Sequence, residues 1–269
     1  MSTRRSSRVH ARLRDAAATR VARKRALGAR QAMLLGAALV ALAVAGTGCV
    51  RVELPAVEIE NDTDRIALDD ASELVVSIEM GAGQLSVAGG ADGAMDAEYE
   101  FTNREWRPEV DYEVRGEEGR LSVRTPSRPR LNLTGHIRYV WDIALSDDVP
   151  LDLSVNMGAG ESRLDLRSLD VRRLQVNVGA GDATIDLSGE GRGNLVADIN
   201  AGAGALRLRV PSHIGVRVVG HRDGIGSYKA DGLIQDGDAL VNSAYEDADV
   251  RYDITLRRGV GDVTIELVD

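Results

Sequence analysis

Apolar and polar residues alternate along most of the chain, and pairs of glycines interrupt this alternation at intervals. In residues 151–168, Leu153 and Val155 precede such a pair, and Leu164 and Leu166 follow it in the same phase. A period of two places alternate side chains on one face, as in a β-strand that buries one side. Because no stretch beyond the N-terminal segment keeps a period of 3.6, the pattern predicts an all-β fold.

One unit, strand–glycine pair–strand, recurs along the chain, with neighbouring copies roughly 22 residues apart. Its copies are 74–90, 151–168, 174–189, 195–211 and 252–268, with a degraded copy at 216–232. Glycine adopts positive φ without a steric penalty, so each pair predicts a corner between two strands. The predicted corner glycines are Gly81, Gly83, Gly158, Gly160, Gly179, Gly181, Gly202, Gly204, Gly226, Gly259 and Gly261.

Two architectures accommodate such units. Stacked as successive rungs they form a β-solenoid, and folded as hairpins they form a sandwich or a barrel. The near-constant period and phase favour a solenoid domain over residues 71–269. The final strand, with Val263, Ile265 and Leu267, is then an open backbone edge, which predicts weak self-association.

The N-terminus has the features of a secretion signal. A basic stretch precedes an uncharged apolar run at 32–46, which predicts a signal or anchor helix within residues 1–48. Gly46-Thr47-Gly48-Cys49 resembles a bacterial lipobox, so we expect Cys49 to carry the lipid that holds the protein on the membrane. An uncleaved anchor and a free secreted protein are the alternatives, and translation from Val21 would give a signal of ordinary length. Residues 49–70 are interpreted as a lipidated N-terminus and polar tether.

Charge divides the chain at the same point. Residues 1–48 carry ten basic residues and one acid, which leaves 23 basic and 41 acidic residues from Cys49 onward. A body of that charge is repelled by phosphate backbones, so we expect no nucleic-acid partner. The single cysteine excludes an intramolecular disulfide and a multi-cysteine metal site.

Candidate chemistry is sparse beyond the signal. The only histidines there, His136, His213 and His221, accompany no recognisable nucleophile or phosphate-binding motif, so we expect no catalytic residue, cofactor or metal site. The acidic segments, including 61–64, leave turn acids and calcium ligands as alternatives. The large aromatic residues are interpreted either as a contact surface for glycan or lipid or as core packing; they are Trp106, Tyr139 and Trp141.

The repeats also resemble a known family, the toast-rack family of bacterial envelope proteins, over nearly all of residues 70–269. The segments that carry the resemblance to its N-terminal half are MGAGQLSVAGGADGAMDAEYEF, REWRPEVDYEVRGEEGRLSV and DDVPLDLSVNMGAGESRLDLRSL, in that order. VPSHIGVRVV, DGIGSYKADGL and NSAYEDADVRYDITLRRGVGDVTIEL are similar to its C-terminal half. The resemblance implies an adhesin-like domain similar to a right-handed β-helix, often behind a membrane or lipoprotein anchor, and it implies no catalytic residues.

These observations predict a non-catalytic lipoprotein of the bacterial cell envelope, anchored outside the cytoplasm, and in the outer membrane if the host has one. Its β-solenoid would present an interaction surface, with a role in envelope structure or stress sensing implied by the family resemblance alone. The alternative is an adhesive or ligand-binding module for a glycan, a cell-wall polymer or an envelope protein. A carbohydrate-active enzyme is the third hypothesis, although no carboxylate pair in the sequence identifies an acid and a base.

Overall fold

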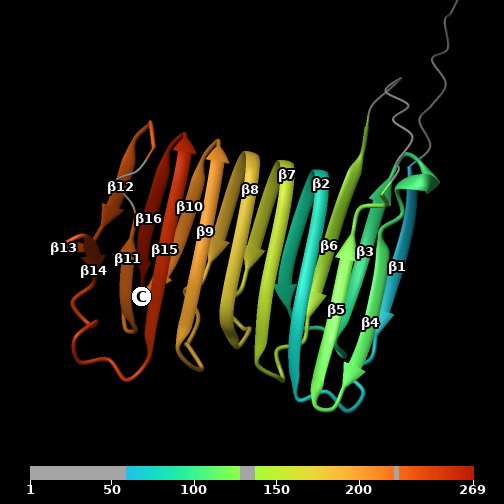
Figure 1. The fold of residues 1–269 in the computed structure, drawn as a ribbon, viewed down its shortest axis with the longest axis horizontal. Coiled ribbons are helices and arrows are strands. Elements are labelled where there is room, and N and C mark those ends of the chain that lie inside the picture. Colours follow the sequence, from blue (N-terminus) through green and yellow to red (C-terminus); the bar gives the residue numbers. More distant parts are fainter. Residues whose placement is uncertain (1–58, 128–136, 221–223) are drawn as a thin grey trace, which may run out of the picture. The chain divides into compact units, whose positions relative to one another are not determined.

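Strands form wherever the sequence alternates, and the predicted all-β class is confirmed. The computed structural model describes residues 59–127, 137–220 and 224–269. This part of the chain holds strands β1 to β16 and one 3-10 turn, η1 (Arg104–Trp106), with no α-helix (Figure 1). The predicted signal or anchor helix lies outside the described residues.

The repeated units are long strands that bend at their glycines. β2 (Glu73–Gly89), β7 (Leu151–Asp165) and β8 (Val171–Asp186) run through the glycine pair without interruption. Two further units divide near it, into β9 (Leu195–Ala203) and β10 (Leu206–Pro211), and into β15 (Arg251–Val260) and β16 (Val263–Val268). We call the part before the glycines the first arm and the part after them the second arm.

Neighbouring units pair in parallel and in register along both arms. β7 and β8 match Leu153 to Leu174 in the first arm and Leu164 to Ile185 in the second. Each described arm pairs with the same arm of the next unit, and β9 and β10 pair with other units rather than with each other. The units are therefore not hairpins.

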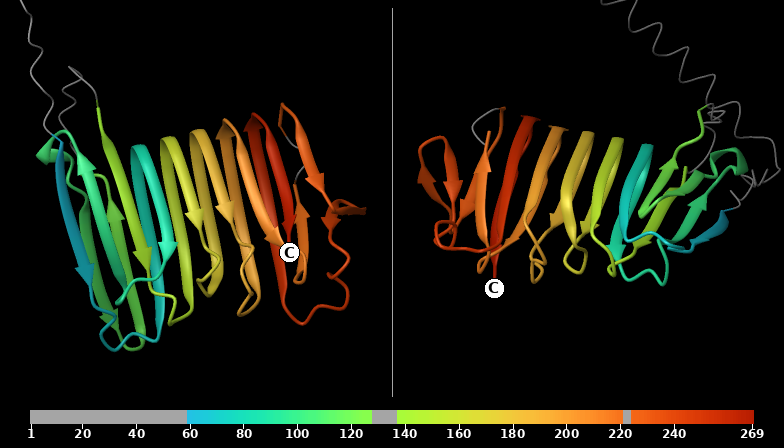
Figure 2. Two further views of the ribbon diagram at one scale, coloured as in Figure 1. Left: turned by 180° about the vertical axis from the view of Figure 1, so that it is seen from behind. Right: turned by 60° about the horizontal axis from the view of Figure 1, so that its bottom comes forward.

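The arms form two layers, visible one behind the other in Figure 2. The first-arm layer has the order β4 (Glu109–Arg115), β5 (Glu118–Arg124), β2, β7, β8, β9, β15, β11 (Gly215–Val219), β14 (Ala239–Val241) and β13 (Ile234–Asp236). The second-arm layer has the order β1 (Glu60–Ile66), β3 (Met95–Phe101), β6 (Tyr139–Leu145), β2, β7, β8, β10, β16 and β12 (Tyr228–Asp231).

The core lies between the layers and is largely aliphatic. Val76 and Ile78 in the first arm of β2 and Leu85 and Val87 in its second arm are buried, and they belong to one continuous cluster. Full burial of one such side chain contributes about 1.5–3 kcal/mol. The polar residues between them face outward, so each layer has one outer face.

The order of units in space differs from their order in the chain. The last unit, β15 and β16, lies between the 195–211 unit and the degraded 216–232 unit (Figure 1). The prediction that the final strand is an open edge is therefore wrong, because β16 pairs with β10 on one side and β12 on the other. Ile254 and Ile265 in this unit are fully buried and need neighbours on both sides, whereas Tyr228 and Ala230 in the degraded copy are only half-buried.

The predicted polar tether also ends earlier than expected. β1 lies inside residues 49–70 and pairs antiparallel with β3 over its whole length. None of its residues is fully buried, because it is an edge strand in which Glu60, Asp62 and Asp64 alternate with exposed residues. Backbone pairing, rather than an apolar face, holds this segment in the layer.

Candidate functional site

The glycine corners are positions where two backbones approach too closely for any side chain. Gly181 has φ of +119°, and a Cβ built on it would lie 1.8 Å from the carbonyl oxygen of Gly160. Real Cβ atoms do not approach an oxygen this closely, so glycine permits the unit spacing. The same approach to a glycine carbonyl of the neighbouring unit occurs at Gly158, Gly160, Gly179, Gly202, Gly204, Gly226, Gly259 and Gly261.

The first unit differs because its neighbour is not a glycine corner. A Cβ on Gly83 would lie 2.4 Å from the carbonyl oxygen of Tyr139 in β6. A Cβ on Gly81 would meet only the side chain of Thr125, at an ordinary 3.9 Å, and Gly81 is not among the residues with positive φ. The Gly81 amide donates to Thr125 Oγ1 at 3.0 Å.

A ladder of asparagines crosses the outer face of the first-arm layer. Asn177 Nδ2 donates to Asn156 Oδ1 at 2.8 Å, and Asn200 Nδ2 donates to Asn177 Oδ1 at 2.9 Å. These residues occupy the same position in β7, β8 and β9, so the parallel register stacks their amides. Each amide oxygen receives a hydrogen bond that the next unit supplies, which ties the units together outside the core.

The rest of this face is mostly polar, with Val75 and Val196 as its exposed apolar residues. One row across it consists of short or uncharged side chains with a single acid: Ser122, Ser77, Ser154, Gln175, Asp198 and Thr255. Several acids on this face are paired with arginine, as in Asp152 with Arg173 at 3.0 Å and Asp198 with Arg257 at 2.8 Å. A depression of about 300 Å³ lies where the ladder meets the glycine corners, lined in part by Asn200, Arg257 and Gly202.

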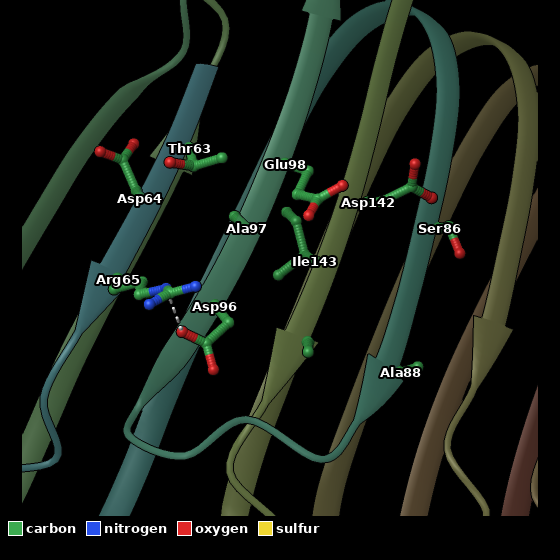
Figure 3. Close-up of a pocket in the computed structure, with 11 residues that line it drawn as sticks. Thr63, Asp64, Arg65, Ser86, Ala88, Asp96, Ala97, Glu98, Asp142 and Ile143 are labelled. Carbon is green, nitrogen blue, oxygen red and sulfur yellow. Dashed lines mark ion pairs between the residues drawn. The ribbon is translucent and has the colours of Figure 1, made fainter. Parts of the chain in front are cut away.

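A second depression, of about 370 Å³, lies on the outer face of the second-arm layer over β1, β3, β6 and β2 (Figure 3). Ala88 and Ala144 are among its small lining residues. Glu98 and Asp142 stand directly opposite each other on β3 and β6, and neither has an ion pair within the described part of the chain. Like charges opposite each other repel, so this depression favours a cationic or hydrogen-bond-donating group.

Arg107, the residue that follows η1, binds two acids of the edge strand β1. Arg107 Nε donates to Asp62 Oδ2 at 2.5 Å and its Nη2 donates to Asp64 Oδ1 at 2.9 Å. The hydrogen bond from Arg107 holds the pKa of Asp62 below its usual range. The sequence left segment 61–64 as either turn acids or calcium ligands. In the structure, two carboxylates of this segment, those of Asp62 and Asp64, are bound by the Arg107 guanidinium.

The aromatic residues do not form a contact surface, which corrects one of the two interpretations above. The exposed fractions are 5% for Trp106, 7% for Tyr139 and 0% for Trp141. Tyr139 contacts both indoles edge-on, with ring centroids 5.8 Å from Trp106 and 5.4 Å from Trp141. Burial raises the pKa of Tyr139 to about 12. Tyr139 and Trp141 pack in the core because β6 lies between β3 and β2 and turns this face inward, and Trp106 of η1 packs against Tyr139.

The remaining sequence candidates do not converge on a reactive centre. Cys49, His136 and His221 lie outside the described residues, and His213 is exposed. Within the described ranges no three His, Cys, Asp or Glu side chains come together as a metal site. The same ranges contain no helix long and apolar enough to cross a membrane.

Sequence reasoning missed the asparagine ladder and the Arg107 contacts. Asn156, Asn177 and Asn200 each stand two residues before the first glycine of their unit, so alignment of the units carried the information. No local pattern marks Arg107, because its partners are more than 40 residues away in the sequence.

The chain is similar to one known protein family and to several solved structures. The family model for the N-terminal domain of toast_rack (DUF2154) matches residues 56–209, more than half of the chain. The structure of a candidate cell adhesion protein from Clostridium sporogenes is 25% identical, with a TM-score of 0.73, and the match covers 78% of this chain and all of that one. A comparison with curated proteins gives no match.

Two further solved structures are more distant. A candidate adhesin from Bacteroides fragilis is 12% identical, with a TM-score of 0.21, over 78% of this chain and 98% of its own. A candidate lipid-binding protein from Parabacteroides distasonis is 12% identical, with a TM-score of 0.23, over 76% of this chain and 96% of its own.

Proposed function

Since a family model covers more than half of it, the chain belongs to the toast-rack family, and we propose that it is a non-catalytic interaction protein of the cell envelope. Its repeated units act as a β-solenoid, a rigid stack that displays the same side-chain positions at regular spacing. The adhesive role is favoured over the structural or stress-sensing role because the Clostridium sporogenes structure, which shares the fold, is a candidate cell adhesion protein.

The observation that carries the proposal is the outer face of the first-arm layer. Parallel, in-register pairing aligns Ser77, Ser154 and Gln175 in one row and the asparagine ladder in the next. Neighbouring strands are about 4.8 Å apart, so each row offers hydrogen-bonding groups at that interval. A long, hydroxyl-rich polymer such as a glycan or cell-wall strand can lie across several units and bond to each of them.

The charges differ between the middle of the first-arm face and the depression on the second-arm face. Arg173 and Arg257 pair with Asp152 and Asp198 on the central strands of the first-arm face, whereas Glu98 and Asp142 in the depression have no ion pair within the described residues. A neutral polymer is bound through hydrogen bonds without the cost of bringing unpaired charges out of water. The first-arm face is therefore the proposed binding face.

The N-terminus supplies the location in this proposal. Residues 1–48 direct export, and Cys49 receives the lipid that keeps the domain on the outside of the membrane. Mass spectrometry of the mature protein would then find a diacylated N-terminal Cys49, and Cys49→Ala would release the chain from the membrane fraction. Residues upstream of Cys49 in the mature protein would contradict this part of the proposal.

A matched pair of substitutions tests the binding face. Gln175→Arg places a long charged side chain in the middle of the first-arm face, and Gln84→Arg places the same side chain on the second-arm face; both glutamines are exposed. We expect the full chain to bind isolated cell-wall and envelope fragments of its host, and Gln175→Arg to weaken this binding while Gln84→Arg leaves it intact. Equal effects of the two variants would contradict the assignment, and loss of binding after protease treatment of the fragments would identify a protein partner.

A further inference from the structure

The two layers have four edge strands in the described part of the chain, and three of them are protected against a further strand. β1 points the acids Glu60, Asp62 and Asp64 toward the interior, where an added strand would meet them. Charges that point inward are a common protection of sheet edges. The other two protected edges are β4 and β13, and each is protected in a different way.

β4 carries three acids and one arginine on its outer face. Antiparallel pairing of two copies of β4 about Tyr112 would set Asp111 against Glu113 of the second copy, and like charges in that position repel. Pairing of β4 about Val114 would instead set Glu113 against Arg115, but these two side chains already bind each other at 2.9 Å. β13 is only three residues long, and the Gln235 side chain donates to the carbonyls of Gly237 and Ala239 beside it. Neither edge therefore offers unpaired complementary charges to a second copy.

β12 is different because its alternating charges are complementary to themselves. It pairs only with β16 among the described strands. The Val263 amide donates to the Ser227 carbonyl at 3.0 Å, so the parallel ladder engages Ser227, Lys229 and Asp231 in turn. Ala230, which lies between two of these residues, then directs its N–H and C=O away from β16, toward the open side.

We propose that β12 pairs antiparallel with β12 of a second copy, centred on Ala230. In this register Ala230 faces Ala230 of the second copy across a two-fold axis and exchanges both backbone hydrogen bonds with it. Lys229 then faces Asp231 of the second copy, and the reverse pair forms by symmetry. Lys229 and Asp231 are both exposed and make no ion pair within the described residues, so the contact satisfies two charges without breaking an existing pair.

This self-pairing does not depend on the proposed binding face, which lies in the other layer. It places the edge for self-association at β12 instead of at the final strand, which is already paired on both sides. The proposal concerns one occupant, a second copy of this chain, because the charge order along the strand is complementary to its own reverse.

Charge-reversed variants of the full chain, purified in a mild detergent, test the register by sedimentation velocity over a concentration series. Lys229→Asp sets two aspartates opposite each other, and Asp231→Lys sets two lysines opposite each other. We expect each single variant to weaken dimerisation about tenfold or more. An equimolar mixture of the two should form a heterodimer, and the double variant with both reversals should regain the wild-type affinity.

Glu161 and Arg163 provide the matched control. They stand two residues apart on the outer face of β7, a central strand of the layer, and form an ion pair at 3.1 Å. Arg163→Asp changes the net charge by the same amount as Lys229→Asp, and Glu161→Lys by the same amount as Asp231→Lys, but both changes lie away from the edge. We expect these controls to dimerise like the wild type. A wild type that stays monomeric at the highest concentration reached, controls that lose dimerisation equally, or single variants that fail to associate when mixed would each overturn the proposal.

Discussion

Gly181→Ala should destabilise the stack more than its small change in volume implies. Two costs combine at this position. The φ of +119° lies in a region that residues with a side chain rarely adopt, at about 1–3 kcal/mol. The added Cβ would also lie 1.8 Å from the Gly160 carbonyl oxygen, so the two units must separate, and overpacking of this kind costs about 1–3 kcal/mol. We therefore expect a loss of about 3 kcal/mol or more.

Two other glycines separate these costs. Gly116 has φ of +66° in open space, so Gly116→Ala should carry the conformational cost alone. Gly81 holds the position of Gly179 in the first unit but faces only the Thr125 side chain, at 3.9 Å, without a positive φ. Gly81→Ala should therefore change the stability by no more than about 0.5 kcal/mol, or stabilise the fold by restricting the unfolded chain.

Thermal unfolding followed by circular dichroism measures all three variants in residues 56–269, which form one compact unit. For a domain of this size, 1 kcal/mol shifts Tm by about 2–4 °C, so Gly181→Ala should lower Tm by at least about 6 °C. The Tm of Gly116→Ala should lie between the Tm of Gly181→Ala and that of the wild type. If Gly181→Ala unfolds at the temperature of Gly81→Ala, the close approach of the two backbones does not limit the stack.

Three further predictions concern the contacts of Arg107, the buried tryptophans and the asparagine ladder. Arg107 lowers the pKa of Asp62 below its ordinary value of 3.8, so the ionised carboxylate stabilises the fold at pH values above the unfolded pKa. This stabilisation is lost as the pH falls through the lower folded pKa. The Tm of Asp62→Asn should therefore lie below that of the wild type at pH 7, and the difference in Tm should disappear in acid. Trp106 and Trp141, the only tryptophans, are buried, so their emission should be blue-shifted and resist acrylamide, and rapid quenching of both would refute the packing. Asn177→Ala removes two side-chain hydrogen bonds and should cost about 1–3 kcal/mol in urea unfolding, and no loss would mean that the ladder does not stabilise the stack.

The sequence was most informative where side chains are buried. Val76, Ile78, Leu85 and Val87 alternate on both sides of a glycine pair, and burial of one face requires that pattern. The aromatic residues could have been assigned in the same way. Tyr139 and Trp141 share the parity of the apolar residues Ile143 and Leu145, so one buried face includes all four.

Features that depend on distant pairing could not be read from local patterns. The alternation in 252–268 indicates a two-armed unit but not which unit it pairs with, and here it separates two units that are adjacent in the chain. β1 is held by its backbone pairing to β3 and has no apolar face to detect. Arg107 finds Asp62 and Asp64 only after the strands and η1 are in place.

The most direct test of the proposed function is a map of the face that binds the envelope. Carbodiimide labelling of carboxylates, read by mass spectrometry, compares the full chain alone with the chain bound to isolated host envelope fragments. Asp152, Asp198 and Asp253 lie on the first-arm face, and Glu98 and Glu161 lie on the second-arm face. We predict that labelling falls on binding at the three aspartates and stays constant at the two glutamates; protection of the glutamates with the aspartates unchanged would contradict the account.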